Sequence, residues 1–145
     1  APVAQLHQLG VHGDAGGGFV ARATTSELDA ALAPSGLTAD EFGIYSVLTS
    51  ADSMTPTDLA RWMSAPLTTV SSYVKRFERR GHVARLRNPN DGRSWVLTLT
   101  PEGHRAHQAA GELFVPVLER VVTALGQHEP GVREALGALR RALHS

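Results

Sequence analysis

Residues 67–94 read LTTVSSYVKRFERRGHVARLRNPNDGRS and largely decide how the chain folds. The segment holds seven of the chain's fourteen lysines and arginines against two acids, Glu78 and Asp91, which gives it a net charge of +5. The whole chain is formally neutral, so the remaining residues sum to about −5. Charge separated in this way is typical of a surface that faces a polyanion, and it predicts nucleic-acid binding by this segment.

The first half of the segment has the pattern of an amphipathic helix over residues 67–80, preceded by Pro66 and ended by Gly81. Apolar residues recur on one side of the helical wheel, at Leu67, Val70, Val74 and Phe77. The other side carries small hydroxyls first and cations later, at Thr68, Ser72, Lys75, Arg76 and Arg79. This order fits a recognition helix, whose first residues reach base edges and whose later cations meet phosphates.

Two capping motifs predict helices before it. Thr38 and Glu41 are spaced as a capping box, which predicts a helix over residues 39–50. Thr55, followed by a proline and then Asp58, predicts a second, short helix that ends near residue 63. A short helix joined by a tight connection to the recognition helix makes a helix-turn-helix.

After Gly81 the apolar period changes from helical to alternating, as in strands. Residues 83–87 and 94–100 form two such strands, separated by the turn NPNDG. Arg85 and Arg87 share one side of the first strand, and Arg93 follows the turn. A basic hairpin after a helix-turn-helix predicts a winged helix-turn-helix.

The chain continues with helical patterns that begin at Thr100. From Leu113 onward the apolar residues spread over roughly 200° of the wheel, which one neighbouring element does not easily cover. Pro116 predicts a kink, and a further helix carries Val132, Leu136, Leu139 and Leu143 at helical spacing. Such broad apolar faces predict a dimer interface.

In this order and spacing, the motifs resemble the MarR family of bacterial transcription regulators. The family's Asp-x-Arg-Ser wing corresponds to residues 91–94, and its strand ending in Leu-Thr before a helix corresponds to LTLTPEG at residues 97–103. The helix end FERRG at residues 77–81 and the following VAR also match, and the likeness runs from about Phe19 to the C-terminus. It implies a mainly α fold with a small β-wing, in which a winged helix-turn-helix is flanked by N- and C-terminal dimerisation helices.

The resemblance further implies a homodimer on a pseudo-palindromic double-stranded DNA operator, with half-sites about one helical turn apart. Arg93 would enter the minor groove, and Asp91 would support the wing by an ion pair with it. With the other cations, the predicted DNA-binding residues are Thr68, Thr69, Ser71, Ser72, Lys75, Arg76, Arg79, Arg85, Arg87, Arg93 and Ser94. The chain departs from the family at SAP, residues 64–66, where a turn glycine is frequent, which leaves open whether Thr68 or Thr69 reads a base.

Two ligand hypotheses accompany this interpretation. His104 and His107 lie three positions apart on one helix, and metal-sensing members of the family are known, but a tetrahedral ion needs further ligands and the chain has no cysteine. We therefore predict no metal and no cofactor. A small-molecule effector could bind among Arg22, Phe42, Tyr45, Trp62 and Met63, although the same helical spacing equally suits a hydrophobic core.

These patterns predict a flexible arm over 1–18, a dimerisation helix over 19–37, the winged helix-turn-helix over 38–100 and C-terminal dimerisation helices over 101–145. The chain lacks a nucleophile elbow, a phosphate-binding loop after a strand and a His-Glu-x-x-His helix, so we expect no enzyme. The absence of cysteines, long apolar stretches and a secretory signal predicts a cytoplasmic protein without a membrane partner.

The sequence thus predicts an effector-responsive repressor that regulates transcription. The alternative is a winged-helix protein-protein interaction module without specific DNA binding. The cationic recognition helix argues against that alternative, because the core of a protein interface is usually depleted of charge.

Overall fold

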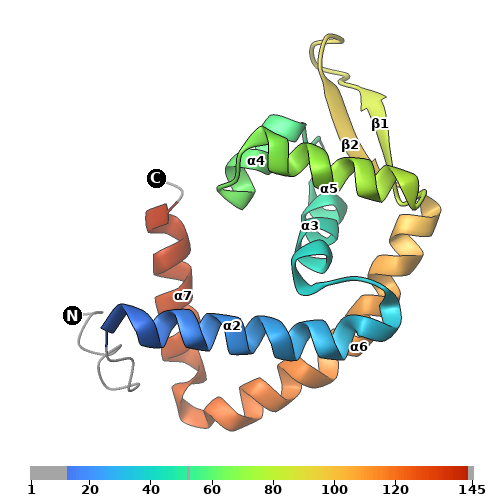
Figure 1. Cartoon of the computed structure of the whole chain (residues 1–145). Coiled ribbons are helices and arrows are strands. Elements are labelled where there is room, and N and C mark those ends of the chain that lie inside the picture. Colours follow the sequence, from blue (N-terminus) through green and yellow to red (C-terminus); the bar gives the residue numbers. More distant parts are fainter. Residues whose placement is uncertain (1–12, 52, 144–145) are drawn as a thin grey trace.

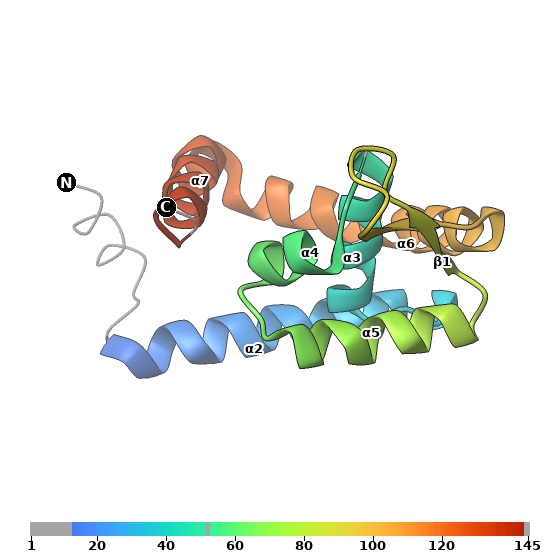
Figure 2. The ribbon, with the colours of Figure 1, turned by 90° about the horizontal axis from the view of Figure 1, so that it is seen from above.

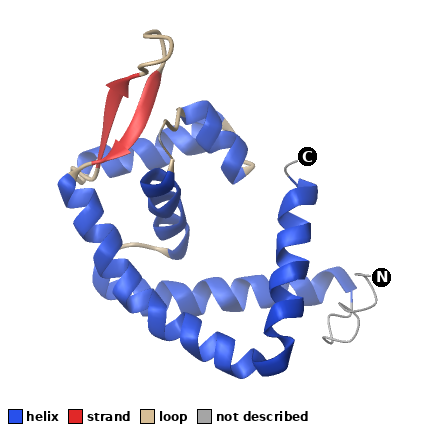
Figure 3. Cartoon of the chain, turned by 180° about the vertical axis from the view of Figure 1, so that it is seen from behind, coloured by secondary structure: helices blue, strands red, loops and turns tan. Residues whose placement is uncertain are grey.

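The structure is a computed structural model that describes residues 13–51 and 53–143. In chain order the elements are α2 (Gly13–Leu32), η1 (Ala33–Ser35), α3 (Ala39–Ser50), α4 (Pro56–Met63), α5 (Leu67–Arg79), β1 (Val83–Arg87), β2 (Trp95–Leu99), α6 (Pro101–Leu125), η2 (Gly126–His128) and α7 (Glu129–Leu143). Helices dominate, and the β1–β2 ribbon projects from them (Figure 1, Figure 3). This confirms the predicted mainly α fold with a small wing. Within the described residues, no helix has the length and apolarity to cross a membrane.

The first helix, α2, begins at Gly13. The sequence predicted a flexible arm up to residue 18, and this was wrong for residues 13–18; residues 1–12 lie outside the described residues. Glycine lowers helix propensity by about 1 kcal/mol per residue without forbidding a helix, and extending an existing helix avoids the cost of nucleation. The helix ends where expected, before Pro34, and Gly36 turns the chain towards α3 with a φ of +78°.

Side-chain caps start α3 and α4. Thr38 Oγ1 accepts a hydrogen bond from Glu41 N at 3.2 Å, and the Glu41 carboxylate accepts one from Thr38 N at 3.1 Å. Thr55 and Asp58 make the same reciprocal pair at the start of α4, at 3.1 Å in both directions. These contacts satisfy amides that the first helical turn leaves without partners, and they confirm both predicted helix starts.

The wing is an antiparallel pair whose register runs from Val83 opposite Leu99 to Arg87 opposite Trp95. A short third segment, which the sequence did not predict, joins β2 through an isolated bridge in which Leu97 N donates to Met54 O at 2.7 Å. The bridge ties the base of the wing to the loop between α3 and α4.

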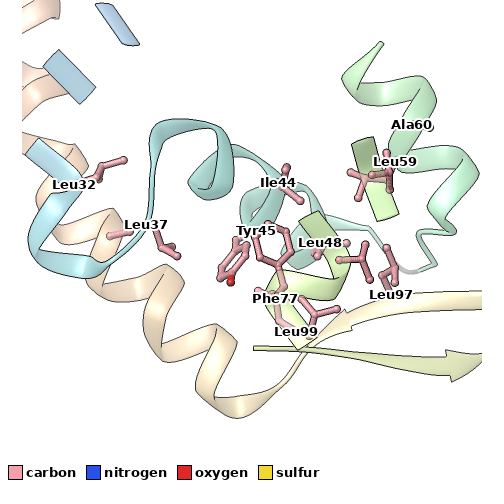
Figure 4. Packing of buried hydrophobic residues seen from close by; sticks show 14 residues of the cluster. Leu32, Leu37, Ile44, Tyr45, Leu48, Leu59, Ala60, Phe77, Leu97 and Leu99 are labelled. Carbon is pink, nitrogen blue, oxygen red and sulfur yellow. The ribbon is translucent and has the colours of Figure 1, made fainter. Parts of the chain in front are cut away.

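The hydrophobic core lies where α3, α4, α5 and the wing meet (Figure 4). Its fully buried members include Ile44 and Tyr45 from α3, Leu59 from α4 and Phe77 from α5. The rings of Tyr45 and Phe77 pack edge to face, with centroids 4.9 Å apart. Fully burying side chains of this size contributes roughly 1.5–3 kcal/mol each, so this cluster holds the recognition helix against the rest of the fold.

A close backbone contact joins α6 to the start of the wing. A Cβ added at Gly103 would lie 2.1 Å from the carbonyl oxygen of His82, and that oxygen also accepts a hydrogen bond from Thr100 N at 2.9 Å. The Thr100 side chain caps α6 by accepting from Gly103 N at 3.1 Å. The glycine of the LTLTPEG motif is therefore required by close packing of the backbone.

The helices α2, α6 and α7 extend away from the wing, and α7 lies with the N-terminal part of α2 at the opposite end of the molecule (Figure 1, Figure 2). α6 runs through Pro116 as one helix, and its ribbon curves gradually in Figure 1. Large apolar side chains remain exposed along α6 and α7, at Val115, Leu118, Val121, Val122, Leu136 and Leu139.

Candidate DNA-binding surface

The recognition helix α5 divides its residues sharply between the core and the surface. Val70, Val74 and Phe77 are at most 2% exposed and pack into the core. The hydroxylated residues Thr68, Thr69, Ser71 and Ser72 and the cations Lys75, Arg76 and Arg79 are all exposed. The structure therefore brings the predicted base-reading and phosphate-binding residues of this helix onto one accessible surface.

At the start of α5 the burial of side chains differs from the helical-wheel prediction. Leu67, which the wheel placed with the core, is 51% exposed, because it lies in the first turn, before the first buried residue of the helix. Pro66 occupies the N-cap position without a side-chain cap, and Ser64 ends α4 in the left-handed region with a φ of +50°. Thr68 and Thr69 both follow within the first turn and are exposed, so either can still read a base.

Arg76 of α5 and Arg80, the C-cap residue of that helix, both pair with one buried carboxylate. The carboxylate of Glu41, fully buried on α3, accepts hydrogen bonds from Arg76 Nη1 at 3.0 Å and from Arg80 Nη1 and Nη2, both at 3.1 Å. Burial alone would raise the pKa of Glu41, but the hydrogen bonds from Arg80 and the Thr38 amide outweigh it and lower that pKa overall. Arg76 also lies over the ring of Tyr73, with 5.1 Å from its Cζ to the ring centroid.

The sequence identified Glu41 only as a helix cap and missed this second role. The sequence held only a weak signal for this role. Arg76 and Arg80 lie four residues apart and therefore share one side of the helix, where an acid from another element could pair with both. Arg76 remains a predicted DNA contact, but its guanidinium is already paired.

The wing loop is ordered by Asp91, although not by the predicted ion pair. Asp91 Oδ1 accepts hydrogen bonds from the backbone amides of Arg93 and Ser94, both at 2.9 Å, and its carboxylate also accepts one from Ser94 Oγ. These amides lower the pKa of Asp91. No ion pair joins Asp91 to Arg93 among the described residues, because the carboxylate is turned towards the backbone; the guanidinium of Arg93 is left exposed at the wing.

The other polar wing residues hold the hairpin together. Ser94 Oγ accepts from Asn88 Nδ2 at 2.9 Å across the loop. Arg87 donates to the carbonyl oxygen of Gly92 at 2.9 Å and lies over the ring of Trp95, 4.9 Å from its centroid. Arg85 forms an ion pair with Glu78 on α5, with 2.7 Å between Nε and Oε1. The predicted DNA-binding residues of the wing thus divide into the outward-facing Arg93 and residues with structural contacts.

The predicted effector residues differ in their surroundings, although Tyr45 lies in the core and Phe42 and Met63 pack against it. Tyr45 is fully buried and its hydroxyl lies 2.9 Å from Nδ1 of His82, with burial raising the pKa of the phenol. Trp62 is 41% exposed on α4, Met63 packs against the core, and Arg22 lies exposed on α2. The effector pocket therefore remains a hypothesis without support from these contacts.

Of the two histidines, His107 has clear partners. Its ring stacks on Phe42 with centroids 5.1 Å apart, and its Nε2 lies 2.9 Å from Ser46 Oγ. Burial and the neighbouring His104 lower the pKa of His107. Among the described residues, no group of three or more His, Cys, Asp or Glu side chains is arranged to hold a metal ion.

Comparisons with known proteins agree with this geometry. The model of the MarR family matches residues 37–95. The multiple antibiotic resistance protein MarR of Salmonella typhimurium is 31% identical over 97 residues, covering 64% of this chain and 67% of that protein. An HTH-type transcriptional repressor of Mycobacterium tuberculosis is 31% identical over 99 residues, covering 68% and 71%. Among solved structures, the M. tuberculosis regulator MosR in complex with DNA superposes with a TM-score of 0.72 at 30% identity, covering 85% of this chain and 89% of that one.

Proposed function

The chain belongs to the MarR family and is a DNA-binding transcription regulator, and from this premise we propose that it acts as a homodimeric repressor on a pseudo-palindromic operator. The recognition helices would enter adjacent major grooves and the wings would reach the flanking minor grooves. The similarity to the MosR structure, which is a complex with DNA, supports this mode of binding.

The observation that carries the proposal is the common exposure of two cationic features, α5 and the wing. α5 presents four hydroxylated residues and then Lys75 and Arg79 to solvent, and the wing presents Arg93. Figure 1 shows the wing projecting beside α5, so both can meet one duplex. Hydroxyls near the start of the helix suit base and phosphate contacts, and the later cations suit phosphates.

The exposed apolar residues of α6 and α7 support the homodimer. Val121 is 47% exposed, Leu136 61% and Leu139 56%; they lie on α7 and on the C-terminal part of α6, away from the wing. Large apolar side chains exposed in such number on two helices are typical of a protein interface. A second copy is the partner that also gives two recognition helices related by a two-fold axis, as a palindromic operator requires.

Repression would follow from occupancy of promoter DNA, and release would require an effector that binds more tightly to an arrangement with a different spacing of the two recognition helices. The protein-interaction alternative is not favoured, because the relatives are transcription regulators.

The proposal is tested by selecting fragments from sheared genomic DNA of the source organism with the purified protein, sequencing them, and repeating the selection across a salt series. We expect an inverted repeat with half-sites about one helical turn apart, bound more weakly as salt increases. Sedimentation of the selected complex would give two chains per duplex. Failure to enrich any fragment at any salt concentration would favour the protein-interaction module instead.

A further inference from the structure

We infer that Glu41 is a positioning residue for DNA binding: it holds the recognition helix α5 through Arg76 and Arg80 and so sets where α5 lies relative to α2, which the family resemblance predicts to be a dimerisation helix. We call Glu41, Arg76, Arg80 and Asp29 the carboxylate clamp. The inference rests on the proposed function, because its consequence is a fixed separation of two recognition helices in a homodimer.

The clamp holds α5 at two points one helical turn apart. Arg80 forms a two-bonded pair with Glu41, one bond to each carboxylate oxygen at 3.1 Å, and Arg76 adds a third bond at 3.0 Å. The carboxylate is fully buried, whereas the side chains of Arg76 and Arg80 are 45% and 31% exposed. Two anchor points on one helix restrict both its rotation and its translation along its axis.

The clamp reaches α2 through the first amides of α3. Thr38 N donates to Glu41 Oε2 at 3.1 Å, and the next amide, Ala39 N, donates to Asp29 Oδ1 at 2.7 Å. Asp29 belongs to α2, so consecutive amides are bound by two carboxylates, one tied to α5 and the other carried by α2. The start of α3 is therefore the junction through which α2 and α5 are placed relative to each other.

Polar contacts of this kind position a helix more narrowly than apolar packing does. A charge-assisted bidentate pair has a narrow range of distances and angles, and burial strengthens it. Val74 and Phe77 contribute attraction without direction, which tolerates small slides of α5. In a homodimer any displacement of α5 is repeated in the second copy, and the separation of the recognition helices must match the half-site spacing.

The test uses two variants of the full chain. Glu41→Gln keeps the size of the side chain but removes its charge, and Arg80→Lys keeps the charge but removes the two-pronged geometry. Asp40→Asn is the matched control, because Asp40 is the adjacent carboxylate in the same helical turn and is exposed. The probe is the duplex that the parent protein selects from genomic DNA, together with forms that have one base pair inserted or deleted at its centre.

We expect the preference of both variants for the selected duplex over the altered spacings to fall at least about threefold. Absolute affinity is not the criterion, because loss of the Glu41 charge also frees Arg76 and Arg80 to meet phosphates. Asp40→Asn should behave like the parent. Thermal unfolding followed by circular dichroism identifies a temperature at which each protein is folded, and binding is compared there. If Glu41→Gln does not fold, Arg80→Lys carries the same criteria.

A folded variant with parental spacing preference would overturn the inference, since the clamp would then not set the position of α5. The proposed function and the clamp are tested by different measurements. Salt-dependent selection of an inverted repeat by the parent tests the proposed function, whereas the response of the variants to spacer length tests the clamp.

Discussion

The salt dependence of DNA binding tests how many cations of the basic segment are available to DNA. Of its seven lysines and arginines, Arg76 and Arg80 are paired with Glu41, Arg85 is paired with Glu78, and Arg87 lies over Trp95. Lys75, Arg79 and Arg93 are exposed, without an ion pair among the described residues. A homodimer would therefore bring six available cations to the duplex.

Each neutralised phosphate contributes about −0.9 to the slope of log K against log salt, so six contacts predict a slope of about −5.4 and a loss of affinity of about 2,000-fold between 50 and 200 mM. Arg93→Ala removes one cation per chain, which lowers the expected slope to about −3.6 and the loss over the same range to about 150-fold. If all seven cations in each chain bound phosphates, the slope would approach about −13.

Fluorescence anisotropy of the selected duplex, labelled at one end and titrated at several potassium chloride concentrations, gives these slopes. Arg133→Ala is the control, because Arg133 is an exposed arginine of α7, far from the wing, and is paired with Glu129. A parental slope for Arg93→Ala would refute its assignment to the DNA surface. A parent slope near the larger value would refute the view that internal pairing withholds four arginines from DNA.

Three further predictions concern stability. Gly103→Ala should destabilise the fold by about 3 kcal/mol or prevent folding, because the added Cβ would clash with the His82 carbonyl. In the control Gly111→Ala the added Cβ meets no atom within 4 Å, so this variant should be neutral or more stable by up to about 1 kcal/mol. Thermal unfolding followed by circular dichroism distinguishes the two variants. Ser64→Gly should stabilise the protein by about 0.5–1 kcal/mol in urea unfolding, because it relieves a left-handed backbone, and an unchanged or lower midpoint would count against strain there. Because folding lowers the pKa of Glu41, its ionised carboxylate stabilises the fold above the ordinary pKa of 4.5, and this stabilisation is lost as pH falls through the pKa of the folded state. Glu41→Gln should therefore lose less stability than the parent over that acid range. Parallel profiles of unfolding free energy against pH would contradict this.

Local signals in the sequence predicted the elements well. The reciprocal hydrogen bonds at Thr38 and Thr55 involve residues three positions apart, so the spacing alone is enough to identify them. Gly81 ends α5 with a φ of +74°, as its position after the last helical residue predicts. The wing followed from the change of period, because the alternation of a strand is also a local property.

The DNA-facing surface was harder to predict from the sequence, because it depends on contacts between residues far apart in the chain. The sequence patterns placed Arg76 on the DNA-facing surface and indicated no role for Arg80 beyond its charge, whereas Glu41, more than thirty residues earlier in the chain, binds both. A helical wheel likewise gives the direction of a side chain but not the edge of the core, and so it misplaced Leu67, which is 51% exposed.

The same pairing explains how so basic a helix can be held close to the core. Lys75, Arg76, Arg79 and Arg80 would repel one another at the C-terminal end of α5, and the buried carboxylate of Glu41 pairs with two of them and offsets one unit of their charge. A buried ion pair is seldom the most stable solution, because well-packed apolar side chains of similar volume are often equal or better. The advantage of the ion pair is that it fixes the orientation of α5, whereas apolar replacements would keep α5 attached without fixing its orientation. Replacing Glu41, Arg76 and Arg80 together by leucine and methionine would therefore separate the two contributions: we expect a folded protein of similar stability that has lost its preference for operator spacing.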